Sequence, residues 1–271
     1  MRSFLYLLPA LIGACDSSVP YPVPYPASKD ERAHVFYASE EFYAKHPEKA
    51  IFVAGGYESE KYSFQMRPIG ANLAIPKNHL VAVTHQFQPW ANKVYDVASV
   101  VVSLPDFAPL TRENSERLMD SASLDRLSIT LGSLSGDLSA TRYQEAVKNG
   151  ALVLDTKRSS PDIPVYRKSF DTEGVEPFFA LPSPSRFRSP LGNDIIIICP
   201  PKRHELLKTQ YPIGDCTVEI ALPPSFFPGV DTEKFGGVAG VGLYYRFNEK
   251  YLREWPAIHQ QLLAFLRGFI Q

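Results

Sequence analysis

Residues 241–247 read VGLYYRF, with Val, Leu, Tyr and Phe at every second position. Residues 216–222 read CTVEIAL and place apolar side chains at alternate positions in the same way. A period of two is typical of a β-strand that buries one face. We therefore predict two strands here, each of which turns one row of side chains toward a hydrophobic core.

An apolar stripe that fits such a core follows at the end of the chain. Pro256 suits the first turn of a helix, where the missing N–H has no partner to lose. Apolar side chains then recur at spacings of three and four, at Ile258, Leu262, Phe265, Leu266 and Phe269. We predict an amphipathic C-terminal helix packed on the preceding strands. The alternative is a helix that binds a membrane or a partner, although its polar face is not rich in lysine.

The rest of the chain carries shorter patterns of the same kind. Residues 97–104 (VASVVVSL) form a continuous, largely β-branched run, which predicts a central strand covered on both faces. Other strands are predicted at residues 51–54, 62–66, 73–75, 80–87, 127–131, 152–155 and 195–199. Short helices are expected at residues 39–45, 111–119 and 142–149, and a capping box of Thr141 with Gln144 should begin the last.

Together these patterns predict an α+β fold of mainly antiparallel sheets, a few short helices and the amphipathic C-terminal helix. Residues 157–190 are rich in Pro, Ser and Arg and hold six prolines, which is typical of a long connection. We expect this connection to separate an N-terminal subdomain, residues 29–156, from the strands and terminal helix of residues 191–271. Both parts place strands before a closing helix, which suggests two similar subdomains, although no residue-level repeat supports this.

The chain begins with the features of an export signal. Arg2 supplies a positive charge, and residues 4–13 are ten uncharged, mostly apolar positions, too few to span a membrane. Residues 12–15 read IGAC, which resembles the bacterial lipobox. The resemblance implies that residues 1–14 are a lipoprotein signal peptide and that Cys15 is lipidated after cleavage. An ordinary secretory signal that ends near a cysteine is the alternative.

A proline-rich tether is expected at residues 15–28, where VPYP occurs twice. Alternate prolines favour extended polyproline II structure at about 3.1 Å per residue, so the tether would hold the folded part up to about 35 Å from a membrane. The alternative is a docking site for a proline-recognising domain. In lipoproteins an aspartate directly after the lipidated cysteine usually marks retention at the inner membrane, and Asp16 occupies that position. The resemblance therefore implies a periplasmic protein anchored in the inner membrane.

Composition restricts the kind of partner. The chain is 45% hydrophobic and 21% charged, as globular proteins are, and its formal net charge is −1. Proteins that bind nucleic acid normally carry a basic excess, so we expect no nucleic-acid partner. The expected contacts are a protein partner and, through the lipid anchor, a membrane.

Two cysteines remain if Cys15 carries lipid. Cys199 and Cys216 enclose 16 residues, and two cysteines in an oxidising compartment most often pair. The chain-entropy estimate gives such a disulfide about 3 kcal/mol of stabilisation. A metal or redox site is the alternative, but the pair lacks the C-x-x-C form and no flanking histidine or cysteine completes a zinc set.

No catalytic motif matches well. The serine-hydrolase elbow G-x-S-x-G is approached at residues 132–136 (GSLSG), but Leu134 occupies the nucleophile position, so we interpret the segment as a loop. Residues 236–242 are glycine-rich but precede a predicted strand, which indicates a hairpin loop or a bulged start of a strand rather than a dinucleotide site. His79 and His85 have no carboxylate at ligand spacing. We therefore expect no catalytic, cofactor-binding or metal-ligating residues.

Several short sequence segments resemble those of a known protein family. They are LAIPKNHL at residues 73–80, LPDF at residues 104–107 with residues 111–114, YRF at residues 245–247, Cys216 before a late strand, and Leu252, Trp255 and Ile258 as an L-x-x-W-x-x-I element. This set resembles the lipoprotein or periplasmic immunity proteins that are encoded beside type VI secretion effectors.

The resemblance implies that the partner is a cognate secreted toxin, such as a lipase or a cell-wall hydrolase, whose active site this protein occludes. Inhibition of that kind needs a complementary surface and no reactive group. The partner-binding residues are unknown, because such proteins recognise individual toxins through divergent surfaces. Two alternatives stay open: a structural or assembly lipoprotein of the bacterial envelope, and a hydrolase with an unrecognised site.

Overall fold

The structure is a computed structural model and describes residues 51–52, 56–66, 70–88, 93–120, 123–135, 138–171, 176–200, 215–230 and 240–271. The predicted signal peptide, the lipidation site Cys15, the tether and the predicted helix at residues 39–45 lie outside these described residues. Those features therefore stay predictions from the sequence.

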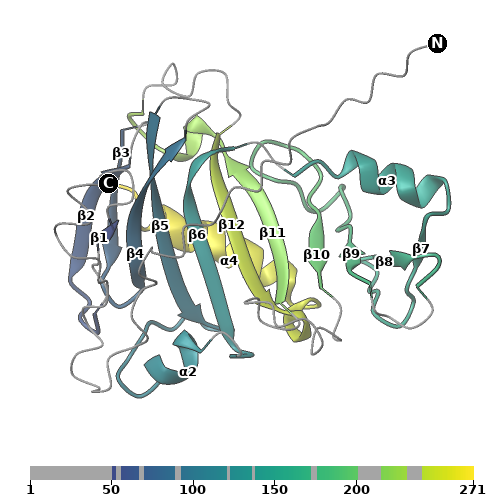
Figure 1. The fold of residues 1–271 in the computed structure, drawn as a ribbon, viewed down its shortest axis with the longest axis horizontal. Coiled ribbons are helices and arrows are strands. Elements are labelled where there is room, and N and C mark those ends of the chain that lie inside the picture. Colours follow the sequence, from purple (N-terminus) through teal and green to yellow (C-terminus); the bar gives the residue numbers. More distant parts are fainter. Residues whose placement is uncertain are drawn as a thin grey trace, which may run out of the picture.

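Ten strands form one antiparallel sheet, which dominates the molecule (Figure 1). In the order in which they pair they are β1 (Ile51–Phe52), β4 (Leu80–Gln88), β5 (Lys93–Ser103), β6 (Arg126–Ser135), β12 (Gly240–Asn248), β11 (Asp215–Leu222), β10 (Ile197–Cys199), β9 (Phe178–Ala180), β8 (Val165–Lys168) and β7 (Leu152–Leu154). A separate hairpin consists of β2 (Lys61–Met66) and β3 (Ala71–Pro76). The predicted class, mainly antiparallel sheets with a few helices, is confirmed.

Three α-helices and two short 3-10 helices belong to the described part of the chain. They are α2 (Ser115–Met119), α3 (Thr141–Lys148), α4 (Trp255–Arg267), η4 (Pro224–Phe226) and η6 (Glu249–Tyr251). Among the described residues, none of these helices has both the length and the apolar character that a membrane span requires. The predicted amphipathic C-terminal helix is present as α4, with proline in its first turn.

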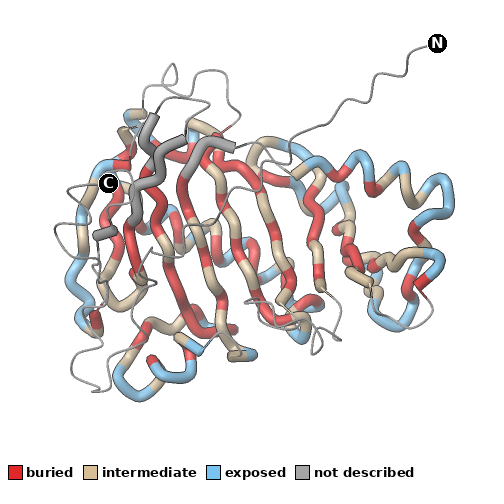
Figure 2. The backbone as a smooth tube through the Cα atoms, viewed as in Figure 1, coloured by how far each residue is buried: buried red, intermediate tan, exposed pale blue. Residues whose placement is uncertain are grey.

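Helix α4 covers one face of the central strands. It lies behind β5, β6 and β12 in Figure 1, and its side chains Ile258, Leu262 and Leu266 are buried. In β12 the predicted alternation is observed, because Leu243 and Tyr245 are buried in the same core while their neighbours are not. Figure 2 shows this alternation of buried and partly exposed residues along β6, β12 and β11. The alternation of period two therefore arises because α4 covers one face of these central strands.

Strand β5 is covered on both faces, as its continuous β-branched sequence predicts. Its side chains Val100 and Val102 belong to the core beneath α4. Val101 points to the other face and packs against Leu110 and Leu118, the second of which lies on α2. Burial on both faces is thus the reason that three consecutive valines, residues 100–102, occupy this part of the strand.

The predicted disulfide joins Cys199 on β10 to Cys216 on β11, with Cα atoms 4.1 Å apart. The two strands pair antiparallel, and the register of Ile198 with Thr217 places the two cysteines directly opposite each other. Both cysteines are fully buried on the face that α4 covers. The bond therefore links two adjacent strands inside the main core.

The observed sheet also bears on the predicted subdomains. Strand β12 pairs with β6, so strands from residues 29–156 and from residues 191–271 belong to one sheet. Residues 157–190, which we expect to be a connection, contribute β8 and β9 to that sheet. The division into two similar subdomains stays a prediction.

Two local predictions are wrong. Ala140 is the N-cap of α3 and has no side chain that can cap it, and Ser139 instead accepts from the amide of Thr141 at 3.3 Å. The side-chain amide of Gln144 does not reach back to the N-cap but donates to a carboxylate oxygen of Asp194 at 2.6 Å. The segment GSLSG is not a loop, since residues 132–135 continue β6. Gly132 has a φ of 144°, and a Cβ there would lie 2.3 Å from the carbonyl oxygen of Asp96 on β5. The glycine thus permits close approach of two strands rather than a nucleophile turn.

The main core contains one buried polar cluster. The indole Nε1 of Trp255 donates to the hydroxyl of Tyr245 at 2.9 Å, and that hydroxyl lies 2.8 Å from Nδ1 of His259. The hydroxyl and Nδ1 share one hydrogen, and which of the two donates depends on the tautomer of the imidazole. The other ring nitrogen, Nε2, is buried and has no hydrogen-bond partner in the part of the chain that the structure describes. Burial lowers the pKa of His259 to about 4.

This cluster predicts a loss of stability in mild acid. The unfolded chain binds a proton at His259 near pH 6.5, whereas the folded protein resists protonation until about pH 4. The free energy of unfolding should therefore fall by about 3 kcal/mol from this residue as the pH drops from 6.5 to 4. Urea unfolding of the wild type and of His259→Gln across this range measures the effect. The Gln variant should show a shallower slope, and equal slopes would contradict the assignment.

Candidate functional site

The central strands present a second face, on the side away from α4. We call it the open face and define it by the side chains Ser128, Thr130, Thr217, Glu219, Tyr244 and Arg246. All six are half-buried. At one side Val101 packs beneath α2, and at the other Ile196 packs in a cluster with α3. The open face therefore lies between two helices that cover the flanking strands.

The registers of three strands fix how these side chains adjoin. Tyr244 on β12 stands between Thr130 on β6 and Glu219 on β11. The next row places Arg246 in the equivalent central position. Cross-strand neighbours lie about 5 Å apart, so the rows form a continuous surface. Tyrosine and arginine, which dominate the binding energy of many protein interfaces, thus occupy the centre of this surface.

Charged side chains gather at the end of the open face where β11 begins and β12 ends. Arg246 has a buried Nε atom that finds no hydrogen-bond partner among the described residues. Burial raises the pKa of Asp215 to about 6, and the positive charges of Arg126 and Arg246 act against this rise. Nearby, the guanidinium Nε of Arg126 donates to the hydroxyl of Ser128 at 2.6 Å. This end of the open face therefore combines one half-buried carboxyl group with two guanidinium groups.

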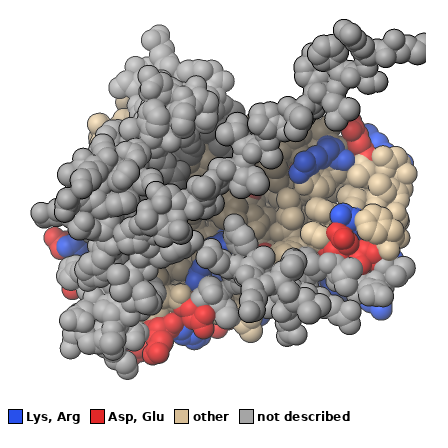
Figure 3. Space-filling view, viewed as in Figure 1, with Lys and Arg blue, Asp and Glu red and all other residues tan. Residues whose placement is uncertain are grey.

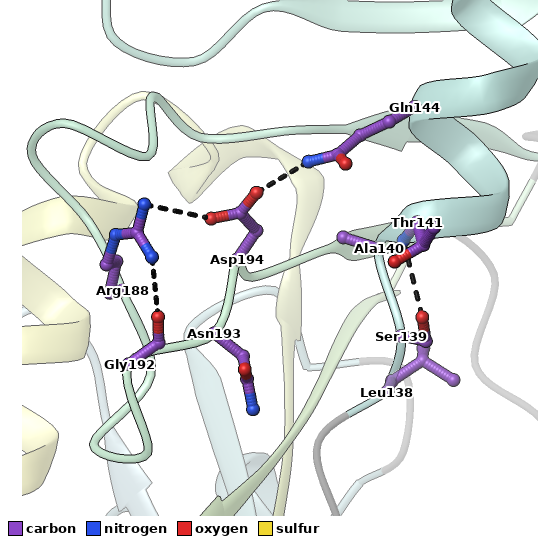
Figure 4. Close-up of a pocket in the computed structure, with 9 residues that line it drawn as sticks. All are labelled: Leu138, Ser139, Ala140, Thr141, Gln144, Arg188, Gly192, Asn193 and Asp194. Atoms are coloured by element: carbon purple, nitrogen blue, oxygen red, sulfur yellow. Dashed lines mark hydrogen bonds and ion pairs between the residues drawn. The ribbon is translucent and has the colours of Figure 1, made fainter.

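A polar cavity of about 370 Å³ adjoins the start of α3. It lies between the helix and the segment that precedes β10 (Figure 4). One wall is held by Asp194, which accepts from Gln144 and lies 3.7 Å from a guanidinium nitrogen of Arg188. The same guanidinium donates to the carbonyl of Gly192 at 2.7 Å. The charged groups of Asp194 and Arg188 already interact with each other and with neighbouring polar groups. They therefore offer little binding energy to a ligand in this cavity.

Figure 3 shows the molecule from the side of the open face. Where described residues are visible, uncharged side chains line a hollow toward the end that carries α3, and basic and acidic side chains stand at its border. This hollow lies beside the open face, whose own centre carries Tyr244 and Arg246.

The remaining candidates from the sequence lie elsewhere. His79 is partly buried and packs against the ring of Phe265, with centroids 5.1 Å apart, and burial lowers the pKa of His79. His85 belongs to β4, opposite Asp96 of β5. The described residues include no cluster of three or more potential metal ligands. The open face was missed by reasoning from the sequence, although its signal was present in the polar positions that alternate with the buried ones in β11 and β12.

The fold thus defines an α+β protein with one large antiparallel sheet and a C-terminal helix on one face. Among solved structures, the chain resembles Smlt3025, described as an immunity protein of the Stenotrophomonas maltophilia type IV secretion system. The TM-score is 0.43 at 10% sequence identity, over 79% of this chain and 95% of that one. No family model and no curated protein sequence matches the chain. We transfer no residue role from that structure.

Asp215 generates a second prediction about pH, opposite in sign to that of His259. Its folded-state pKa is raised from 3.8 to about 6, so the ionised carboxylate destabilises the folded protein above pH 6. This cost disappears as the pH falls from 6 to 3.8. Asp215→Asn should therefore be more stable than the wild type at pH 7.5 and equally stable near pH 4, as measured by urea unfolding.

Glu219→Gln is the matched control, since it makes the same carboxyl-to-amide change on the same strand and face. A variant Asp215→Asn that is less stable than the wild type at pH 7.5 would show that attraction to the two arginines outweighs burial.

Proposed function

We propose that this protein is a membrane-tethered periplasmic protein that binds and neutralises a secreted toxin. In this proposal Cys15 carries the lipid, residues 15–28 form the tether, and the folded part faces the periplasm. The finer proposal is that the toxin is a type VI secretion effector, a lipase or a cell-wall hydrolase, whose active site is occluded. This finer proposal comes from the sequence resemblance described above.

The open face is the observation that carries the proposal. Its side chains stand on β6, β12 and β11, which pair with strands on both sides and are backed by the main core. A surface held this rigidly loses little conformational entropy when a partner docks. Tyr244 and Arg246 supply the large, partly desolvated side chains that anchor interfaces.

The disulfide supports the proposed compartment. Cys199 and Cys216 form a bond that persists in oxidising surroundings such as the periplasm and is rare in the cytosol. This agrees with the lipobox at residues 12–15 and with the export signal before it.

The proposal is tested by co-expression with the neighbouring gene, whose product is directed to the periplasm. We expect the neighbour to be toxic alone and harmless together with this protein, and the two products to form a complex. Tyr244→Ala and Arg246→Ala should each raise the dissociation constant at least about tenfold, as interface anchors do. Isothermal titration calorimetry measures this, and the thermal midpoint of each variant verifies that it is folded.

Lys77→Ala is the control, because Lys77 follows β3, is not part of the open face, and its ammonium group forms an exposed ion pair with Glu60. A harmless neighbour, or the absence of a complex, would count decisively against the proposed function. If the complex forms with unchanged affinity in both open-face variants, the toxin contacts a different surface of this protein.

A further inference from the structure

The outer edge of β7 carries unpaired backbone groups. β7 is the last strand of the sheet, and only β8 pairs with it in the described part of the chain. The amide of Ser169 donates to the carbonyl of Ala151, and the amide of Asp155 donates to the carbonyl of Val165. In an antiparallel pair the groups that face the neighbour belong to every second residue. The N–H and C=O groups of Leu152 and Leu154 therefore point away from β8.

Apolar side chains accompany this edge. Leu154 is 50% exposed and Phe170, in the turn after β8, is 71% exposed. They are two of the three large hydrophobic side chains that are exposed in the described part of the chain; the third is Leu124. Natural edge strands are normally protected by charges, proline or a covering segment. An edge strand with an exposed leucine is instead suited to pairing with another strand.

The charges around β7 indicate which kind of strand would pair. Lys148 ends α3 just before β7, and Lys157 follows just after it; both side chains are exposed, and neither makes an ion pair within the described residues. Two of the nearby acidic groups are engaged, since Asp155 pairs with Arg158 and Glu176 pairs with Lys168. The ends of the edge are therefore positive, while its centre is apolar.

We propose that the outer edge of β7 receives an extended segment of the toxin that has an apolar centre and acidic ends. The segment adds an eleventh strand to the sheet, with backbone hydrogen bonds to Leu152 and Leu154. Its apolar side chains contact Leu154, and its acidic ends lie near Lys148 and Lys157. The identity of the occupant rests on the proposed function, whereas the chemistry of the edge does not.

Leu154→Pro tests the backbone contact. Proline removes the outward N–H of residue 154 but none of the hydrogen bonds to β8, which Val153 and its odd-numbered neighbours make. In the complex with the neighbouring gene product, this variant should raise the dissociation constant at least about tenfold. Leu154→Thr keeps the N–H and should weaken binding less. Leu124→Thr, the same change at the other exposed leucine, should leave affinity unchanged.

Hydrogen exchange locates the contact independently of the variants. The amides of Leu152 and Leu154 should exchange more slowly in the complex, while the amide of Val153, already bonded to β8, should change little. Lys148→Glu together with Lys157→Glu should weaken binding, and the loss should shrink at high salt because the attraction is between exposed charges.

Three results would overturn the inference. A toxin complex with unchanged exchange at Leu152 and Leu154 and full tolerance of Leu154→Pro would refute the edge contact and leave the proposed function intact. Concentration-dependent dimers that Leu154→Pro abolishes would assign the edge to a second copy of this chain. If the toxin does not bind, the proposed function fails, and a synthetic peptide with a Val-Thr-Val centre and Glu at both ends replaces the toxin as the probe of the edge. If this peptide binds more tightly than the same peptide with Lys at both ends, the edge contact is supported without the toxin. If the two peptides bind equally, the edge contact is refuted as well.

Discussion

The packing of α4 against one face of β6, β12 and β11 is the constraint on which the rest of the structure depends. Trp255, Ile258, Leu262 and Leu266 are all buried there, and each such side chain contributes about 1.5–3 kcal/mol through removal from water. Because a strand has a period of two, the same packing turns the intervening residues to the other side. The position of α4 therefore decides which side chains of the central strands are available to a partner.

A shift of one residue in the register of β12 would exchange the two faces. Tyr244 and Arg246 would enter the core, and Tyr245 and Phe247 would leave it. Three features hold the register in place: the hydrogen bond from Trp255 to Tyr245, the contact of Tyr245 with His259, and the burial of the disulfide between β10 and β11. The polar cluster in the core thus helps to specify the surface on the opposite side of the sheet, at the expense of stability in acid.

Local patterns predicted much of the fold. The strands at residues 216–222 and 241–247, the final helix and the partnership of Cys199 with Cys216 all follow from spacing and composition. The order of the strands did not, because β6 and β12 are more than a hundred positions apart and no local pattern encodes their pairing. β8 and β9 were missed since they are only four and three residues long and lie among prolines. The capping box failed because the N-cap residue is an alanine, and Gln144 finds a partner fifty positions away.

The site was harder to predict than the fold. Motifs for catalysis or metal binding are found by type and spacing, whereas a binding surface consists of ordinary side chains that the fold brings together. Tyr244, Arg246 and Glu219 stood out only once α4 was known to cover the other face. The positive-ended edge of β7 likewise depends on the register with β8, which the sequence does not reveal.

The central claim is that the side of the sheet opposite α4 meets the toxin. Site-specific photo-crosslinking in living cells tests it most directly, with a photoreactive amino acid placed either at Tyr244 on the open face or at Gln261, an exposed position of α4. We predict a crosslink to the neighbouring toxin from position 244 and none from position 261. A crosslink from position 261 alone would contradict the account.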